Sequence, residues 1–403
     1  GLAQVLAGLG LLLPRWFDVA APPQSFPAPF DLSFTIEPLR FGGNDVVAVI
    51  AIPLAFAGLA LFLRTRLGVA MRGCADDADR AALLGIPVRR VHSVVWTIAA
   101  VLAFLAVFLR AGIVGLSIGT VLGPGLLLPA LAAAVIGRME RLPTIAVAAI
   151  ALGIIEQSVV WGWNQPDYVQ PVLFVVVLAA VWLTPAGAGL RGRIEPSTWR
   201  AIREPRPVPR ELARLPEVRI TGAAFLAVVV VGLAAVPVVF TESRTNLAAV
   251  AVIYGVIALS LVVLTGWAGE VSLGQMAFVA IGAAAGGSIT ARWGWDLALG
   301  LLGAGIVGAA VAVLIGLPVL RRRGLTIAVI TLAFSLATTA WLLNPRVFGD
   351  GTRFDWLPPA RVDRPDLFGF VDVRSETRYY YLCLIALGLT VVAVRGIRRS
   401  RTG

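Results

Sequence analysis

PAGAGLRGRIEPSTWRAIREPRPVPRELARLPEVR, residues 185–219, is a long polar stretch that divides two blocks of nearly continuous apolar sequence. It holds eight arginines against four glutamates. Five prolines between residues 196 and 216 rule out a long helix, because proline lacks the backbone N–H that a helix interior needs. The stretch is therefore predicted to be a linker. The chain is predicted to have three parts, namely residues 1–185, a cytoplasmic linker of residues 186–219, and residues 220–403.

Both blocks are too apolar for a water-soluble protein. Of the 403 residues, 58% are hydrophobic and 14% are charged, whereas soluble domains are about half apolar and about a quarter charged. Runs of roughly 20 apolar residues, the length of a transmembrane helix, recur along the chain. We therefore predict an all-α fold, a polytopic transmembrane helical bundle of about 11 full spans plus one partial span.

The apolar runs give the span boundaries. In the first block the full spans are predicted at residues 46–63, 92–109, 112–137, 142–161 and 171–184. In the second block they are predicted at residues 220–240, 247–264, 273–291, 297–320, 325–343 and 379–394. Residues 1–13 are too short to cross a bilayer, so the chain is expected to begin inside a helix. Glycines and prolines between residues 123 and 129 favour a broken or re-entrant helix in the third span.

Arginine placement predicts the orientation. Residues 64–90 carry six arginines around three aspartates, and such loops favour the cytoplasmic side. Counting spans from this loop also places the linker and Arg321 to Arg323 on the cytoplasmic side. It also places residues 344–378 outside. Six arginines in this outer loop oppose that placement, although six acidic residues balance their charge.

Several kinds of chemistry are excluded. The sequence contains no lysine, which excludes a Walker A loop and Schiff-base catalysis, so ATP hydrolysis must belong to a partner. Cys74 and Cys383 are far apart in sequence and suggest no disulfide framework, and a single His92 suggests no zinc site. No catalytic residue, metal or cofactor is expected. Nucleic-acid binding is not expected either, because the arginines lie in short loops between apolar runs.

A glycine-rich stretch, TGWAGEVSLGQMAFVAIGAAAGG, covers residues 265–287. Polar and glycine residues gather at its start, and glycine and alanine permit close approach between helices. One interpretation is a tight packing face with an interfacial carboxylate, and the other is a turn that lines a pore. The pore interpretation assigns a translocation path to Thr265, Gly266, Gly269, Glu270, Ser272, Gly274 and Gln275.

Glu156 also lies in an apolar run. A carboxylate in hydrocarbon is costly and usually faces a cavity or a partner, so Glu156 is a further candidate for the translocation path. Because Glu156 falls near the outer end of its predicted span, an interfacial position is the alternative.

The stretch TGWAGEVSLGQMAF, residues 265–278, resembles a signature near the start of one of the two permease subunits of branched-chain amino-acid ABC importers. RRRGLTIAVITLAF, residues 321–334, resembles the next hallmark of that subunit, and residues 379–403 resemble the span before its ATPase-docking loop. RTRLGVAMRGCADDADRAALLGI, residues 64–86, resembles the docking loop of the companion permease, whose late glycine-rich span corresponds to residues 142–156. The chain thus resembles a tandem fusion of the C-terminal part of one permease subunit with the N-terminal part of its companion.

The match to this family has gaps. The family commonly has a glycine-rich turn where this chain has residues 137–142, and the linker matches neither subunit. Residues 399–403 echo residues 64–68, so the chain is expected to stop as it enters a second docking loop. The family also includes urea and amide importers, which leaves the substrate open.

The resemblance implies a permease of a bacterial inner membrane that performs no chemistry itself. Its expected partners are cytoplasmic ABC ATPase subunits, an extracytoplasmic solute-binding protein, the lipid bilayer and a small-molecule substrate. The family's ATPase-coupling segment corresponds to Asp79, Arg80, Ala81, Ala82, Leu83, Leu84 and Gly85, and a plain solvated turn is the alternative for it.

Two other functions remain as alternatives to an importer permease. An ion-coupled secondary transporter should place ionisable groups at the bilayer midplane, and this chain offers few. An intramembrane enzyme would need a nucleophile with its base or a metal, for which the sequence shows no pattern.

Overall fold

The computed structural model describes residues 39–115, 125–138, 141–183, 215–319, 325–349 and 372–399, with shorter groups of residues before 39 and between 352 and 368. Residues 184–214, which make up most of the predicted linker, lie outside the described residues, as do Arg321 to Arg323 and residues 400–403. Gly123 and Pro124 of the predicted helix break also lie outside them.

The chain forms two compact units. The first comprises residues 1–130 and 139–147, and the second comprises residues 131–138 and 148–403. The second unit therefore holds helices from both sides of the linker. The division of the chain into three parts at the linker stays a prediction.

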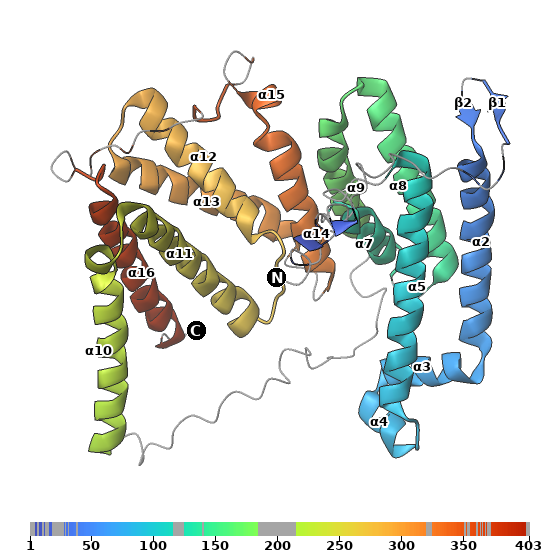
Figure 1. Cartoon of the computed structure of the whole chain (residues 1–403), viewed down its shortest axis with the longest axis horizontal. Helices are drawn as coiled ribbons and strands as arrows, with labels where there is room; N and C mark the ends of the chain where they lie inside the picture. The colour runs from blue at the N-terminus through green and yellow to red at the C-terminus, as the bar shows by residue number, and fades with distance from the viewer. Residues whose placement is uncertain are drawn as a thin grey trace. The chain divides into compact units, whose positions relative to one another are not determined.

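The first unit contains a hairpin of β1 (Phe34–Ile36) and β2 (Leu39–Phe41), which pair antiparallel. The helices α2 (Gly43–Arg64) and α5 (Val88–Val114) follow, with α3 (Arg66–Asp76) and α4 (Ala78–Leu83) between them. Asn44 at the start of α2 donates to the carbonyl of Gly112 near the end of α5 at 2.7 Å. This hydrogen bond joins opposite ends of the two long helices, so they run antiparallel (Figure 1).

Two helices, α7 (Leu127–Ile136) and α8 (Leu142–Trp163), have residues in both units. The rest of the second unit consists of short elements and long helices in chain order. These are η1 (Pro166–Tyr168), α9 (Val169–Leu183), α10 (Pro216–Val239), α11 (Glu242–Leu261), η4 (Val262–Trp267), α12 (Gln275–Trp293), α13 (Leu297–Val319), α14 (Leu325–Ala337), η5 (Thr338–Leu342), α15 (Pro345–Phe348) and α16 (Glu376–Arg399).

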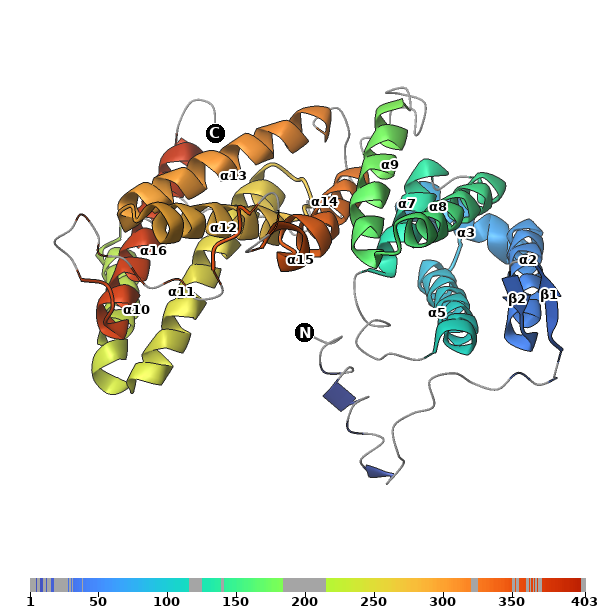
Figure 2. The same cartoon turned by 90° about the horizontal axis from the view of Figure 1, so that it is seen from above.

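Helix α14 is the central packing element of the second unit. It is buried almost continuously from Ala328 to Phe334, and α9 and α12 both pack on it (Figures 1 and 2). The ring of Phe334 lies 5.8 Å from that of Phe174 on α9 and 5.0 Å from that of Phe278 on α12. Around this centre α12 packs along α13, and α11 packs along α16.

The helices confirm the predicted fold class. Eight helices of the described part are long and apolar enough to cross a membrane, and two shorter apolar helices accompany them, Leu127–Ile136 and Thr326–Leu342. At most 22% of any span window is buried within the chain, which suits helices whose outer surface faces lipid or other subunits. The count of about 11 full spans stays a prediction.

Candidate functional site

The polar start of the stretch 265–287 lies in a break between two helices. Helix α11 ends in the π-helical turn η4, and α12 begins only at Gln275. Between them residues 268–274 are not helical, and Gly269 has a φ of 72°, a left-handed conformation that suits glycine. π-helical turns of this kind are frequent at functional sites.

The broken segment is docked on α14. The backbone N–H of Leu273 donates to Oγ1 of Thr331 at 3.0 Å, and Thr331 in turn donates to the carbonyl of Ile327 at 2.9 Å. Gly274 lies so close to the backbone that a Cβ there would stand 2.4 Å from the carbonyl oxygen of Thr331. Only glycine therefore allows this approach of the segment to the helix.

Polar side chains continue the contact toward α11. Gln275 donates through Nε2 to Oγ of Ser260 at 2.8 Å, which ties the start of α12 to the end of α11. Ser272 is buried. Oε2 of Glu270 is also buried, and it has no hydrogen-bond partner among the residues that the structure describes. The break therefore gathers one carboxylate and several amide and hydroxyl groups around an uncoiled backbone.

The structure divides the predicted path residues into two groups. Thr265, Gly266, Gly269, Glu270, Ser272, Gly274 and Gln275 share one short segment that includes η4 and the start of α12. Glu156 is half-buried on α8, and α8 makes no extensive contact with η4 or α12 in the described part of the chain. The structure thus brings seven of the predicted residues together and leaves Glu156 apart.

The predicted coupling segment folds as a short capped helix. Asp77 accepts hydrogen bonds from the backbone N–H groups of Asp79 and Arg80 at 3.1 and 3.0 Å, which caps the start of α4. Its carboxylate also pairs with Nε of Arg80 at 3.1 Å. Gly85 follows the helix with a φ of 81°, the left-handed conformation that ends many helices.

One face of this short helix is anchored and the other is exposed. Ala81 is buried against Cys74 and Val91, so α4 packs onto α3 and α5. Leu83 and Leu84 are 88% and 82% exposed. Two adjacent exposed leucines on a rigid, capped turn suit contact with another protein.

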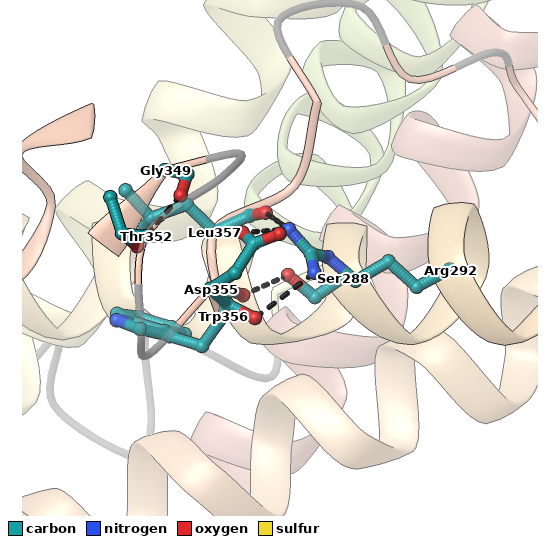
Figure 3. Close-up of polar contacts among 7 residues, drawn as sticks. All are labelled: Ser288, Arg292, Gly349, Thr352, Asp355, Trp356 and Leu357. Atoms are coloured by element: carbon teal, nitrogen blue, oxygen red, sulfur yellow. Dashed lines mark hydrogen bonds and ion pairs between the residues drawn. The ribbon is translucent and has the colours of Figure 1, made fainter. Parts of the chain in front are cut away.

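The predicted outer loop is clamped to the end of α12 (Figure 3). Arg292 donates to the carbonyl of Asp355 at 3.0 Å and to that of Leu357 at 2.6 Å, and it pairs with the Asp355 carboxylate. Ser288, one turn earlier on α12, donates to the carbonyl of Trp356. Side chains of α12 therefore fix the backbone of residues 355–357.

Two further ion pairs involve arginines of residues 344–378. Arg364 pairs with Glu376 at 3.0 Å, and Arg378 pairs with Asp372 at 3.2 Å. The outer placement of residues 344–378 stays a prediction, because the orientation rule counts arginines whether or not they are paired. Arg364 and Tyr379 also line a cavity of about 350 Å³ whose other walls are mainly small residues of α12 and α13.

Sequence reasoning missed several of these groups. Thr331 lies inside the stretch 321–334 that carried the resemblance, but nothing in the pattern indicated its hydrogen bond to Leu273. No sequence pattern pointed to the hydrogen bond of Ser260 with Gln275 or to the ion pair of Arg292 with Asp355, because the two residues of each contact are not neighbours in sequence. In the described part of the chain no group of three or more histidine, cysteine or acidic residues could hold a metal.

Comparison with known families gives matches on both sides of the linker. The model of a family described as "Branched-chain amino acid transport system / permease component" matches residues 2–181 and 243–403. Two matched segments, separated by residues that include the linker, agree with the predicted fusion of two permease portions.

Individual relatives carry the same description. The chain is 30% identical over 194 residues to the high-affinity branched-chain amino acid transport system permease protein LivM of Salmonella typhimurium, which is 43% of this chain and 45% of LivM. It is 31% identical over 146 residues to LivH of Escherichia coli strain K12, covering 35% of this chain and 46% of LivH. It is 34% identical over 131 residues to BraD of Pseudomonas aeruginosa, covering 31% of this chain and 41% of BraD.

Each of these matches spans less than half the length of the relative. No solved structure matches the chain.

Proposed function

Because the chain belongs to the family of permease components of branched-chain amino acid transport systems, we propose that it forms the substrate path of an ATP-driven importer. It is a multi-pass protein of the bacterial inner membrane, and its cargo would be branched-chain amino acids or related small polar solutes. It performs no chemistry itself, and separate cytoplasmic ATPase subunits hydrolyse the ATP.

The observation that carries this proposal is the uncoiled segment between η4 and α12. The segment joins the cytoplasmic ends of the predicted spans 247–264 and 273–291, and its docking on Thr331 covers the non-helical backbone with protein. Helix breaks of this kind form the substrate sites of many transporters. The segment supplies the proposed path with Thr265, Gly266, Gly269, Glu270, Ser272, Gly274 and Gln275, and Glu156 on α8 is a further, separate member.

The short helix α4 is the proposed contact with the ATPase. Its segment from Asp79 to Gly85 would insert the exposed Leu83 and Leu84 into a cleft of the ATPase. Closure of the ATPase on ATP would then favour one arrangement of the spans, because the ATPase binds the two arrangements with different free energies. An extracytoplasmic solute-binding protein would deliver the substrate to the loop that Arg292 clamps.

The half-buried Glu270, whose Oε2 is buried, also favours a second function. A carboxylate with one buried oxygen that has no hydrogen-bond partner in the described structure is what an ion-coupled secondary transporter would use to bind a proton or sodium. The two functions differ in their energy source, so one experiment separates them.

That experiment is leucine uptake into vesicles that contain the full-length protein, its ATPase and its binding protein. We expect uptake with ATP inside, persistence of this uptake when an uncoupler is added, and loss of uptake without ATP. Uptake that does not depend on ATP and is lost when the uncoupler is added would instead establish the secondary transporter. Urea in place of leucine tests the alternative cargo.

A matched pair of variants tests the path. Glu270→Gln keeps the shape of the side chain and removes its charge, and we expect it to slow ATP-driven uptake by about tenfold, the effect of about 1.4 kcal/mol on the barrier. Glu156→Gln makes the same change on α8. Equal uptake by the Glu270→Gln variant and the unmodified protein would remove Glu270 from the path.

A further inference from the structure

A long groove runs between α2 and α5, the two antiparallel helices of the first unit (Figure 1). It has a volume of about 560 Å³ and is lined by residues between 48 and 59 of α2 and between 102 and 114 of α5. Every lining residue except Arg110 is apolar. Ala48 and Leu109 are buried, whereas Ile52 and Ile113 are about half exposed, so the groove is open along one side.

The dimensions of the groove fit one extended hydrocarbon chain. At about 1.5 Å per residue, residues 48–59 extend roughly 17 Å along α2. The apolar core of a bilayer is about 30 Å thick, so the groove is about as long as one leaflet is deep. Dividing the volume by this length gives a mean cross-section of roughly 33 Å², less than half that of a helix about 10 Å in diameter. A further helix is therefore too wide to fill the groove, whereas a single acyl chain is narrow enough.

Arg110 lies at one end of the groove. The apolar span predicted at residues 92–109 ends just before it, and α5 continues for only one more turn to Val114, roughly 6 Å along the axis. An arginine so close to the end of a span extends its charged group to the level of the lipid headgroups. The loop before α5 is predicted to be cytoplasmic, so this end of α5 is predicted to lie at the outer surface.

The guanidinium of Arg110 has no protein partner in the part of the chain that the structure describes. It is exposed, and it forms no ion pair or hydrogen bond there. Asp45 starts α2 at the same end, but its carboxylate accepts the N–H of Gly42 at 2.8 Å and so caps its own helix. A charged group at the edge of the hydrocarbon is costly unless it is paired, so Arg110 needs an anion from outside the described chain.

The groove and the arginine together specify an amphiphile. The groove offers apolar contact over the depth of one leaflet, and Arg110 offers a cation at headgroup level. The guanidinium group binds phosphate through two parallel N–H···O bonds. A phospholipid carries a hydrocarbon chain next to a phosphate and so meets both features, whereas a free anion would contact only Arg110 and leave the groove unfilled.

We propose that the groove between α2 and α5 is a binding site for an anionic phospholipid of the outer leaflet. One acyl chain lies along both helices against the small side chains of Ala48, Ala55 and Ala106, and the phosphate binds Arg110. The bound lipid contacts α2 and α5 together and so stabilises their pairing. The site goes beyond the proposed function, because it does not depend on what the protein transports.

Native mass spectrometry of the full-length protein in detergent tests the site. Phosphatidylglycerol or phosphatidylcholine is added stepwise, and the dissociation constant of each lipid is measured. Arg110→Gln removes the charge, Arg110→Lys keeps it, and Ala106→Leu fills part of the groove. The matched controls are Arg244→Gln, at an exposed arginine of α11, and Ala100→Leu, at an exposed alanine of α5 outside the groove.

We expect phosphatidylglycerol to bind more tightly than phosphatidylcholine. Its binding should weaken about fivefold in Arg110→Gln, the effect expected of one arginine at an anionic lipid surface, and by a similar factor in Ala106→Leu. Arg110→Lys and both controls should bind as the unmodified protein does. Phosphatidylglycerol should also raise the unfolding temperature of the unmodified protein more than that of Arg110→Gln, because a ligand that binds only the folded state stabilises it.

Four results would overturn the site. Equal binding by Arg110→Gln and the unmodified protein would show that Arg110 does not hold the phosphate. Equal binding by Ala106→Leu would place the acyl chain outside the groove. If the unmodified protein retains no lipid, other parts of the full-length protein cover the groove. Displacement of the lipid by inorganic phosphate would show that Arg110 takes a free anion rather than a lipid.

Discussion

Tyr380 on α16 donates its hydroxyl to the backbone carbonyl of Leu233 on α10 at 2.7 Å. Pro237 is the reason that this carbonyl needs a donor, because proline has no N–H to give to the residue four positions earlier. Tyr381 donates to the next carbonyl, that of Ala234, at 2.9 Å. An unpaired carbonyl in hydrocarbon costs free energy. The tyrosine hydroxyls of α16 supply the missing donors and so offset the cost of the proline in α10.

This relationship predicts a coupled effect of two substitutions. Tyr380→Phe should lower the free energy of unfolding by about 1–3 kcal/mol, because the Leu233 carbonyl loses its donor. The same change should cost less in a Pro237→Ala background, where the alanine N–H can take over. Thermal unfolding of the four proteins in detergent measures the coupling. Tyr254→Phe on the exposed side of α11 is the control, and an equal loss in both backgrounds would contradict the explanation.

The close approach of Gly274 to α14 predicts a steric effect. Gly274→Ala would place a Cβ 2.4 Å from the Thr331 carbonyl oxygen, so the segment must move. We expect a loss of about 1–3 kcal/mol of stability and a loss of transport. Gly308→Ala on α13 is the matched control, because its Cβ would meet no atom within 4 Å and Gly308 lies outside the proposed path. A Gly274→Ala variant as stable and active as the control would show that the segment is not held against α14.

The exposed leucines of α4 predict a defect in assembly without a defect in folding. Leu83→Ser and Leu84→Ser should change stability by no more than about 0.5 kcal/mol, because both side chains are on the surface. Co-purification of the ATPase should nevertheless fall several-fold, and ATP-driven uptake with it. Leu67→Ser, an exposed leucine on α3, serves for comparison. If both variants co-purify as much ATPase as the unmodified protein, α4 is not the contact with the ATPase and the alternative of a plain solvated turn holds.

A related substitution addresses the end of the same helix. Gly85→Ala should cost about 1–2 kcal/mol, because a Cβ opposes the left-handed conformation although no neighbouring atom blocks it. Hydrogen exchange of residues 78–85 would detect the loosening. Unchanged exchange would mean that the turn does not depend on the glycine.

The clamp on the outer loop predicts a change in protease sensitivity. Arg292→Gln removes the ion pair to Asp355 and weakens the bonds to the loop backbone. We expect added protease to cleave residues 350–375 faster in intact cells or right-side-out vesicles. Arg244→Gln, at an exposed position of α11, should leave the rate unchanged. Cleavage that requires an opened membrane would place this loop on the cytoplasmic side and reverse the predicted topology.

The positions of the helices could be predicted from the sequence, but the contacts between the helices could not. Runs such as residues 142–161 and 297–320 correspond closely to α8 (Leu142–Trp163) and α13 (Leu297–Val319), because length and apolarity alone define a span. The predicted all-α fold did not include the hairpin of β1 and β2. The partners of Thr331 and Arg292 lie 58 to 65 residues away, and such pairs depend on how helices pack rather than on any local pattern.

The packing of α9 on α14 has a consequence for assembly. These helices belong to the two segments that the family model matches separately, and in this chain they are joined covalently. Joining them turns the meeting of two permease portions into an intramolecular event, with an effective concentration set by the linker rather than by expression. The two portions are therefore made in a fixed one-to-one ratio, and dilution in the membrane cannot separate them.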